Sequence, residues 1–481
     1  MTTIKIQQMM ADSGVAFGTS GARGLASQMT AQVCQAYTLA FLQGVGLAKA
    51  GQKIALGMDL RPSSPDIVRA CAAAIRQAGC EVDFCGTLPT PALAYYAMSH
   101  GLPAIMVTGS HIPFDRNGIK FYRADGEITK ADEAAMTAAE VVVEAMQDDG
   151  IMPAVNPSAL AAYRQRYVSL FAPAMLSGWR IGLYEHSSVA RDGLRDILVA
   201  LGAEVLGLAR TDTFVPIDTE AVSVEDRQRG LGWAVEHGFD AIISTDGDGD
   251  RPLLADETGN WFRGDIVGLL CAHFLGAETV VTPVSCNTAI EACGLFKRVV
   301  RTRIGSPYVI AGMEQAEVEG SRAVAGFEAN GGFLAGKGLA VEGKPLAALP
   351  TRDAVLPALA LLAMAKKQGV KLSQLSADLP RRFTASDRIQ NFPAAHSQAL
   401  LARLQNDDTA YRSLWGDELG KVVSRDLTDG LRLTFAGGDI VHLRPSGNAP
   451  ELRCYAEADS MERAQGLVES TLEAIVTDFG C

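Results

Sequence analysis

A strand, a turn, an amphipathic helix, a glycine and a second strand follow one another three times along this chain. Lys53–Asp59 leads into an expected helix over 65–78, and Arg180–Glu185 leads in the same way into a helix over 192–201. A weaker copy of the pattern runs over 279–294. Because such alternation favours right-handed crossovers on mixed or mainly parallel sheets, the sequence predicts an α/β fold built from three similar layers.

The length of the chain predicts several domains. At 481 residues it is too long for a single hydrophobic core, and we expect about three or four domains. A first boundary is expected at 148–157, where glycine and two prolines interrupt a stretch rich in alanine and valine. Near the C-terminus the pattern changes to a smaller α+β unit that ends in an expected helix over 461–479. We therefore expect three similar α/β domains with mixed sheets over 1–150, 151–256 and 257–372, and a smaller α+β domain over 373–481.

Charge and composition argue against several classes of protein. The net charge of −12 disfavours nucleic acid as the main partner, because that usually requires a basic surface. The longest apolar run, 354–365, contains Pro357 and is shorter than the ~18 residues that a membrane span needs. The N-terminal residues lack the apolar core of a secretory signal, and the nine cysteines form no C-x-x-C pair. We therefore expect a cytoplasmic protein with reduced thiols and no membrane partner, of unknown oligomeric state.

The segment D-G-D-G-D-R follows the apolar run G-F-D-A-I-I-S-T, which is expected to be a strand. Its carboxylates, Asp246, Asp248 and Asp250, alternate with glycines that let the backbone fold tightly around one hard cation such as Mg²⁺. Because Mg²⁺ takes few carboxylates together with a substrate oxygen, one coordination position is left for a phosphate. A calcium EF-hand loop also fits the spacing, with Glu257 at its last position, but Arg251 stands where that loop needs glycine. Metal binding is therefore favoured over both an EF-hand and an acidic surface turn.

Ser110 lies in the segment T-G-S-H, which follows a second expected strand, P-A-I-M-V. A serine in such a loop is either a turn residue or a nucleophile, and the spacing does not fit the G-x-S-x-G elbow of hydrolases. His111 and Lys120 supply polar neighbours. A serine oxygen close to a Mg²⁺ site could accept and return a phosphoryl group, so both interpretations stay open.

Three further segments carry polar groups in turns. In G-F-E-A-N-G-G, Glu328 could accept hydrogen bonds from sugar hydroxyls, and Asn330 could both donate and accept them. In G-T-S-G-A-R-G, Arg23 is either a cation on a flexible turn or a phosphate contact. The basic loop R-P-S-G-N near the C-terminus is either a nest for a phosphate or a surface turn with solvated arginines. As a nest it would use Arg444, Ser446, Gly447, Asn448 and the nearby Arg453.

Taken in chain order, four motifs resemble those of the α-D-phosphohexomutase superfamily: T-G-S-H, D-G-D-G-D-R, G-F-E-A-N-G-G and R-P-S-G-N. Together with G-T-S-G-A-R-G near the start, the resemblance covers essentially the whole chain. It implies four domains around a central cleft, to which each domain contributes one motif. It also implies that Ser110 is phosphorylated and binds Mg²⁺ together with Asp246, Asp248 and Asp250. Arg23 and Lys120 match positions near the transferred phosphate, and they join Ser110 and His111 as candidate catalytic residues.

The resemblance implies a reaction as well. A phosphoserine would convert a hexose phosphate into a bisphosphorylated sugar, which turns over and returns its other phosphate to Ser110. The sugar bisphosphate is thus both intermediate and activator, and the partner is a small-molecule hexose phosphate. Arg251 would help to bind the sugar phosphate or orient the metal loop. Because the pKa of arginine lies above ~12, we expect charge stabilisation from Arg23 and leave proton transfer open between Arg23 and Lys120.

Several positions depart from the pattern of the superfamily. Asn330 stands where many members have serine, Gly332 where they have histidine, and Ser306 where another histidine is expected. Glu451 stands where the phosphate loop usually has a lysine. The opening motif together with E-A-N-G-G looks most like bacterial phosphomannomutases, so mannose is the expected sugar. The alternatives are a phosphoglucomutase, a phosphoglucosamine mutase or a non-catalytic relative that binds sugar phosphates.

Overall fold

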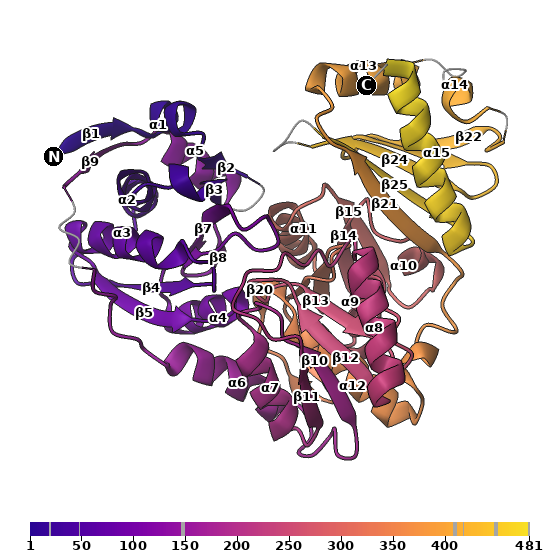
Figure 1. Ribbon diagram of the computed structural model, residues 1–481, viewed down its shortest axis with the longest axis horizontal. Coiled ribbons are helices and arrows are strands. Elements are labelled where there is room, and N and C mark those ends of the chain that lie inside the picture. The colour runs from indigo at the N-terminus through magenta and orange to yellow at the C-terminus, as the bar shows by residue number, and fades with distance from the viewer. Residues whose placement is uncertain are drawn as a thin grey trace.

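The computed structural model describes residues 1–18, 21–47, 49–145, 150–406, 411–416, 418–446 and 451–479. Three α/β units follow one another along the chain, and a C-terminal unit, orange to yellow in Figure 1, stands at one side of them. The names domain 1 to domain 4 denote the ranges predicted above, whose exact boundaries stay predictions.

Domain 1 contains a mixed sheet with the strand order β2-β3-β7-β6-β4-β5, and β8 pairs with β7. Its strands are β2 (Ala16–Phe17), β3 (Ala22–Leu25), β4 (Lys53–Met58), β5 (Glu81–Thr87), β6 (Ala104–Val107), β7 (Arg116–Arg123) and β8 (Gly126–Glu127). Its helices are α1 (Ile6–Ser13), α2 (Ala31–Leu39), α3 (Ser64–Gln77), α4 (Thr90–His100) and α5 (Lys130–Ala138). A separate antiparallel pair joins β1 (Thr2–Lys5) to β9 (Glu140–Val143).

Domain 2 has the strand order β11-β10-β12-β13, and domain 3 has the order β15-β14-β16-β17-β20. The elements of domain 2 are α6 (Ser158–Leu170), β10 (Arg180–Tyr184), α7 (Arg191–Ala200), β11 (Glu204–Leu208), α8 (Val224–His237), β12 (Ala241–Thr245) and β13 (Pro252–Ala255). The helices of domain 3 are α9 (Gly264–Phe274), α10 (Ala289–Ala292), α11 (Ser306–Val318) and α12 (Val355–Gln368). Its strands are β14 (Thr279–Pro283), β15 (Arg298–Thr302), β16 (Val324–Phe327), β17 (Phe333–Ala335), β18 (Ala340–Val341), β19 (Lys344–Pro345) and β20 (Leu349–Asp353).

The three α/β units share one topology, so the predicted threefold similarity is confirmed. In each unit the first strand lies between two parallel partners, and a fourth strand returns antiparallel to the third; the runs are β5-β4-β6-β7, β11-β10-β12-β13 and β15-β14-β16-β17. The sequence signals for the first two helices hold to within one residue. Helix α3 has Pro65 and Asp66 in its first turn and is followed by Gly79 at φ 76°, a conformation that favours glycine. The weaker third copy corresponds to α10, which is one turn long.

Domain 4 is an antiparallel sheet with the order β21-β25-β24-β23-β22, as expected for a smaller α+β unit. Its strands are β21 (Phe383–Ile389), β22 (Val422–Asp426), β23 (Leu431–Phe435), β24 (Ile440–Pro445) and β25 (Leu452–Ala458). Its helices are α13 (Ala394–Asn406), α14 (Tyr411–Trp415) and α15 (Met461–Phe479), and α15 has the predicted bounds.

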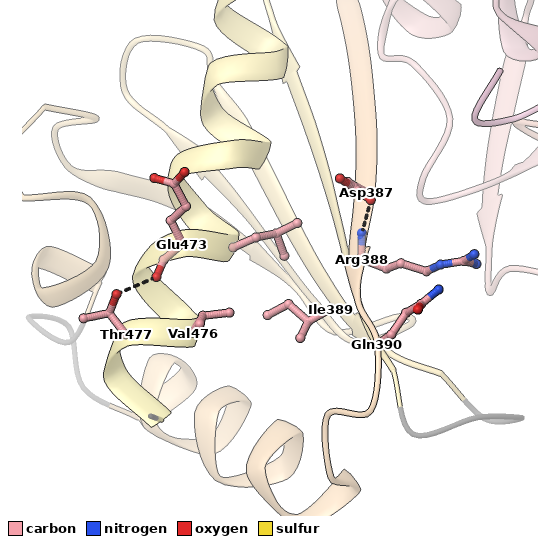
Figure 2. A pocket seen from close by; sticks show the side chains of 8 residues that line it. Asp387, Arg388, Ile389, Gln390, Glu473, Val476 and Thr477 are labelled. Carbon is pink, nitrogen blue, oxygen red and sulfur yellow. Dashed lines mark hydrogen bonds between the residues drawn. The ribbon is translucent and has the colours of Figure 1, made fainter. Parts of the chain in front are cut away.

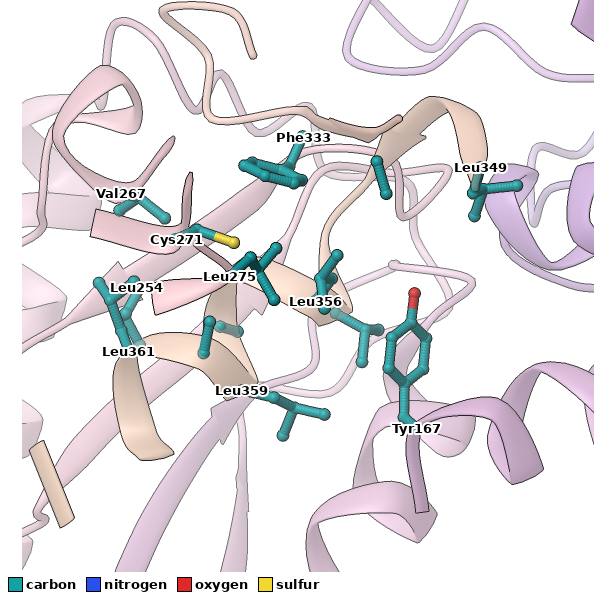
Figure 3. Packing of buried hydrophobic residues seen from close by; sticks show 14 of the residues in the cluster. Tyr167, Leu254, Val267, Cys271, Leu275, Phe333, Leu349, Leu356, Leu359 and Leu361 are labelled. Carbon is teal, nitrogen blue, oxygen red and sulfur yellow. The ribbon is translucent and has the colours of Figure 1, made fainter. Parts of the chain in front are cut away.

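One hydrophobic core joins the first three domains, whereas domain 4 has a core of its own. Figure 3 shows Tyr167 of α6 beside Leu356 and Leu359 of α12, with Phe333 and Cys271 packed in the same cluster. The cysteines of the described residues are all free, and all but Cys293 are buried, as expected for structural thiols. No helix among the described residues is long and apolar enough to cross a membrane. The shared core fixes the first three domains relative to one another.

A buried carboxylate connects domain 4 to domain 3. Glu457 of β25 accepts hydrogen bonds from the backbone N–H of Thr288 at 3.1 Å and from Arg382 Nε at 2.6 Å, and also from the Thr288 hydroxyl. Asn287 Nδ2 donates to the backbone oxygen of Arg382 at 2.7 Å. This joint is polar and small compared with the shared core.

Candidate functional site

Three of the four predicted motifs occupy the same place in the repeated topology. Residues 108–115 connect β6 to β7, residues 246–251 connect β12 to β13, and residues 328–332 connect β16 to β17. Each loop therefore follows the third parallel strand of its unit, at the carboxyl edge where ligands of open α/β sheets commonly bind. Because the three units share a core, this edge places polar loops from three domains around one site.

Ser110 lies at the centre of this site and is fully buried. Its Oγ donates to Asp246 Oδ2 at 2.6 Å and lies 3.4 Å from His111 Nδ1. Its φ of 51° is in the left-handed region, which non-glycine residues rarely adopt, and its N–H donates to Thr108 Oγ1 at 2.8 Å. The surrounding structure thus holds the serine in a strained conformation that points its hydroxyl at the acidic loop.

Arg61 holds the serine loop from behind, and no sequence motif indicated it. The guanidinium is buried and donates to four backbone oxygens of the loop and the start of β7. These are the oxygens of Ser110 at 2.9 Å, Ile112 at 2.6 Å, Pro113 at 2.7 Å and Arg116 at 2.8 Å. Arg61 also pairs with Asp59 at 3.3 Å and stacks 3.9 Å from the ring centroid of Phe214 of domain 2. In the sequence, only the position of Arg61 shortly after the expected strand over 53–59 could have indicated this role.

The acidic loop presents three buried carboxylates whose oxygens lie within 4.8 Å of one another. Asp246 Oδ1 accepts the backbone N–H groups of Asp250 and Arg251, each at 3.2 Å, which curls the loop around that carboxylate. Burial, Asp248 and Asp250 raise the pKa of Asp246 well above its usual value. A divalent cation would offset this repulsion and favour the ionised form.

Asp248 and Asp250 each use one carboxylate oxygen for hydrogen bonds and have a second oxygen that fits a metal ion. Asp248 Oδ2 accepts hydrogen bonds from Lys120 Nζ at 2.7 Å and from Thr90 Oγ1 at 2.7 Å. Asp250 Oδ2 accepts a hydrogen bond from Lys120 Nζ at 2.9 Å. The other oxygens, Asp248 Oδ1 and Asp250 Oδ1, are buried and have no hydrogen-bond partner among the described residues. Buried carboxylate oxygens without a partner are costly, and hard cations bind such oxygens. The donor set therefore matches the predicted metal site.

The basic side chains around the cluster differ in their protonation state. Burial, Arg251 and Arg352 lower the pKa of Arg23 to about 10, which keeps it protonated at neutral pH. Burial would lower the pKa of Lys120, but Asp248 and Asp250 outweigh it and raise the value above the usual range. Burial, Arg251 and Arg23 lower the pKa of His111 far enough to keep its ring neutral. Arg251 itself lies 3.6 Å from Asp250 Oδ1.

The sugar loop approaches the acidic loop through Arg352, a second residue that sequence reasoning missed. Arg352 Nη1 donates to Glu328 Oε2 at 3.1 Å, while its Nη2 donates to Asp250 Oδ2 at 2.8 Å. Asn330 Oδ1 accepts the N–H of Gly332 at 2.9 Å, and its backbone oxygen accepts Thr219 Oγ1 at 2.7 Å. Glu328 and Asn330 are thus buried beside the acidic loop.

In domain 4 three arginines lie opposite one another on neighbouring strands. Arg453 of β25 is the register partner of both Arg388 of β21 and Arg444 of β24, so the three side chains leave the same face of the sheet. Figure 2 shows Arg388 on the side of β21 that faces away from α15. Arg444 Nε donates to Asp429 Oδ2 at 2.9 Å. The row forms a cationic patch that adds Arg388 to the predicted basic loop.

The remaining residues of the basic loop are placed only in part. The N–H of Ser446 donates to the backbone oxygen of Glu451 at 2.8 Å. Gly447 and Asn448 lie outside the described residues. Glu451 Oε2 lies 3.8 Å from Arg453 and 3.9 Å from Arg388, so this carboxylate balances part of the cationic patch.

Glu220 of domain 2 interacts electrostatically with both domain 4 and the acidic loop. Burial and Asp218 raise its pKa, while Arg453 and Arg251 oppose the rise. Arg453 of domain 4 and Arg251 of the acidic loop therefore both act on one carboxylate. A separate groove of about 870 Å³ between β21 and α15 (Figure 2) is lined by none of the predicted site residues.

We predict that replacing Arg61 loosens the serine loop. Arg61→Met removes the donors of four backbone oxygens and leaves Asp59 buried without its cation, which costs about 3–5 kcal/mol in comparable buried pairs. The amides of 108–116 should then exchange hydrogen faster. Arg164→Met, which removes a single exposed ion pair with Asp196, serves as control. Unchanged exchange of the loop in Arg61→Met would show that the guanidinium does not hold it.

Known proteins resemble this chain over nearly its whole length. The phosphoglucomutase/phosphomannomutase domains match it, alpha/beta/alpha domain I over residues 14–142, alpha/beta/alpha domain III over 263–383 and the C-terminal domain over 391–474. A phosphomannomutase of Salmonella muenchen is 49% identical over 97% of this chain and 97% of its own length. A phosphoglucosamine mutase of Symbiobacterium thermophilum is 29% identical over 96% of this chain and 99% of its own.

Solved structures show the same fold. A phosphoglucomutase/phosphomannomutase family protein from Burkholderia thailandensis aligns with a TM-score of 0.72 at 19% identity, over 95% of this chain and 97% of that one. The N-acetylphosphoglucosamine mutase of Aspergillus fumigatus, in complex with GlcNAc-6P and magnesium, aligns with a TM-score of 0.60 at 13% identity, over 98% and 99%. The family matches and the close relative together show that this chain belongs to the phosphoglucomutase/phosphomannomutase family, in agreement with the resemblance of its motifs to the α-D-phosphohexomutases.

Proposed function

We propose that the protein is a phosphomannomutase, which interconverts mannose 6-phosphate and mannose 1-phosphate through a phosphoserine at Ser110. The observation that carries this proposal is the 2.6 Å hydrogen bond from Ser110 Oγ to Asp246, which brings a buried hydroxyl from domain 1 into contact with the acidic cluster of domain 2. A relative named phosphomannomutase that is 49% identical over nearly the full length supports mannose as the sugar.

We assign the acidic cluster to Mg²⁺. Ser110, Asp246, Asp248 and Asp250 would hold the ion, with Asp248 Oδ1 and Asp250 Oδ1, which accept no hydrogen bond from the described residues, as ligands. When bound, the ion would neutralise charge on the phosphoryl oxygens. Lys120 supports the same loop from domain 1 by binding the opposite oxygens of Asp248 and Asp250.

The proposed transfer balances without any further reactant. A hydroxyl of the hexose phosphate attacks the phosphorus on Ser110, so that the Oγ–P bond breaks and a bond from the sugar oxygen to phosphorus forms. The proton of the hydroxyl finally resides on Ser110 Oγ, and the product is a sugar bisphosphate. We assign charge stabilisation to the protonated Arg23 and Lys120, and transfer of the proton to His111, whose ring is neutral and whose Nδ1 lies 3.4 Å from Ser110 Oγ.

The phosphate that is not transferred needs a second site. We assign it to the basic loop, with Arg444, Ser446, Gly447, Asn448 and Arg453, and to Arg251 beside the acidic loop. In a chain with a net charge of −12, such a dianion requires concentrated local positive charge, and the row of arginines on domain 4 supplies it. Glu328 and Asn330 would bind hydroxyls of the sugar between the two phosphate sites. We also propose that the protein is located in the cytoplasm.

Removal of the Ser110 hydroxyl tests the phosphoserine. Ser110→Ala should abolish interconversion of mannose 1- and 6-phosphate, because no group remains to carry the phosphoryl between the two oxygens. Mass spectrometry should find one phosphoryl group on the Ser110 peptide of the unaltered protein. Ser470→Ala, on the outer helix α15, should leave both results unchanged. Near-normal turnover in Ser110→Ala would exclude the proposed route.

Metal dependence and sugar preference are tested in one coupled assay. A chelator should stop the reaction and added Mg²⁺ should restore it, whereas Asp248→Asn should respond weakly to Mg²⁺ because it loses a charged ligand. Activity that persists in chelator would exclude the metal site.

The value of kcat/KM should be highest for mannose phosphate; a higher value for glucose or glucosamine phosphate would assign the protein to one of the alternative activities.

A further inference from the structure

Gly332 of the sugar loop is a glycine for reasons of space. It is buried, and its φ is not in the left-handed region. A Cβ at this position would lie 2.5 Å from Arg352 Cδ and 2.7 Å from Arg352 Cγ, which is closer than real contacts of Cβ atoms. The stem of Arg352 therefore occupies the room that a side chain at 332 would fill. In the resemblance described above, this is a position where many members have histidine.

The guanidinium of Arg352 connects the acidic loop to the sugar loop. It donates to Asp250 Oδ2 through Nε at 3.1 Å and Nη2 at 2.8 Å, and to Glu328 Oε2 through Nη1 at 3.1 Å. The side chain is 4% exposed, so water screens these contacts little. Burial opposes the charged form, but Asp250, Glu328 and Glu127 raise the pKa of Arg352 well above its usual value. A permanent cation thus links the two loops.

The backbone that carries Arg352 is held on both sides. On one side, Thr351 Oγ1 donates to Glu127 Oε1 at 2.8 Å, and Glu127 also accepts Ser306 Oγ at 3.0 Å. On the other, Asp353 accepts Tyr163 at 2.7 Å, and also Tyr167 of the same helix, α6. These neighbours come from domains 1, 2 and 3, so the position of Arg352 is fixed by all three.

We propose that Arg352 is a positioning residue that orients Asp250 for the metal ion and Glu328 for the sugar, using the space left by Gly332. By binding Asp250 Oδ2 with two N–H groups, it leaves Asp250 Oδ1 as the oxygen for the ion; Arg251 Nε lies 3.6 Å from Oδ1, beyond hydrogen-bond distance. By binding Glu328 Oε2, it fixes the carboxylate that would accept the sugar hydroxyls. The part of this inference that concerns the sugar rests on the proposed function, whereas the part that concerns the metal does not require turnover.

The first experiment measures binding of Mn²⁺ alone by electron paramagnetic resonance. Arg352→Met should weaken binding by about 10- to 100-fold, the usual cost of removing a partner of a metal ligand. Arg352→Lys, which keeps a charge but cannot bind Asp250 with two nitrogens, should lie between Arg352→Met and the unaltered protein. Arg301→Met removes an arginine that donates to the backbone oxygens of Pro283, Cys286 and Asn287, none of which belongs to the acidic or the sugar loop, and it should leave the affinity for Mn²⁺ unchanged. Unchanged affinity in both Arg352 variants would overturn the proposal, and Arg352→Lys carries the test if Arg352→Met does not fold.

The second experiment tests the shared space. As the only change in the protein, Gly332→Ala should weaken Mn²⁺ binding, because the added methyl group displaces Arg352. In an Arg352→Ala background the same change should cost less, because the two closest contacts, with the Arg352 stem, are gone and only Asn330 Oδ1 remains, at 3.0 Å. Equal losses in both backgrounds would contradict the proposal.

Kinetics separate this inference from the proposed function. Arg352→Met should raise KM for mannose 1-phosphate through the freed Glu328 as well as lower kcat at a fixed Mg²⁺ concentration. If the unaltered protein binds Mn²⁺ but interconverts no hexose phosphate, the proposed function fails while the metal part of the inference is still decided by the Mn²⁺ data. If the protein is an active mutase and the Arg352 variants match it in Mn²⁺ affinity and KM, the inference fails alone.

Discussion

Three buried carboxylates within 4.8 Å of one another are the constraint around which this structure is organised. Alone, they would repel one another and carry a large desolvation cost. Lys120 of domain 1 and Arg352 of domain 3 offset part of that cost through hydrogen bonds to Asp248 and Asp250. Ser110 of domain 1 donates a hydrogen bond to Asp246. Because these partners come from domains 1 and 3, the acidic loop of domain 2 connects all three α/β domains.

The repeated topology explains why loops so far apart in sequence meet. Each α/β unit places one functional loop after its third parallel strand, and the shared hydrophobic core sets the three units around a common edge. Domain 4 lacks this topology and has a separate core, and polar contacts join it to domain 3 at Glu457 and at Asp429, whose Oδ2 accepts the N–H of Ile304 at 2.9 Å. The cationic patch is therefore carried by a domain that lies outside the shared hydrophobic core.

The sequence was informative where chemistry needs a local run of residues. The alternating aspartates and glycines, the serine after an apolar strand and the helical periodicity of 461–479 are all visible without a structure. Arg61, Arg352 and Arg388 are not, because each is a single arginine whose role arises from backbone oxygens or carboxylates that only the fold brings near. The length of α10 was likewise hidden, since a one-turn helix leaves too short a pattern to measure.

The departures from the superfamily pattern acquire a physical interpretation in the fold. Gly332 makes room for Arg352, Ser306 binds Glu127 beside it, and Glu451 balances Arg453 and Arg388. Each of these three residues thus has a defined contact that depends on its small size, its hydroxyl or its charge.

The most direct test of the account is the fate of a labelled phosphoryl group on Ser110 in a single turnover. Protein carrying radiolabelled phosphoserine is mixed with unlabelled mannose 1-phosphate and quenched within one reaction cycle. The account predicts that the label leaves Ser110 and appears in mannose bisphosphate. Label that stays on the protein, or is released as inorganic phosphate, would contradict it.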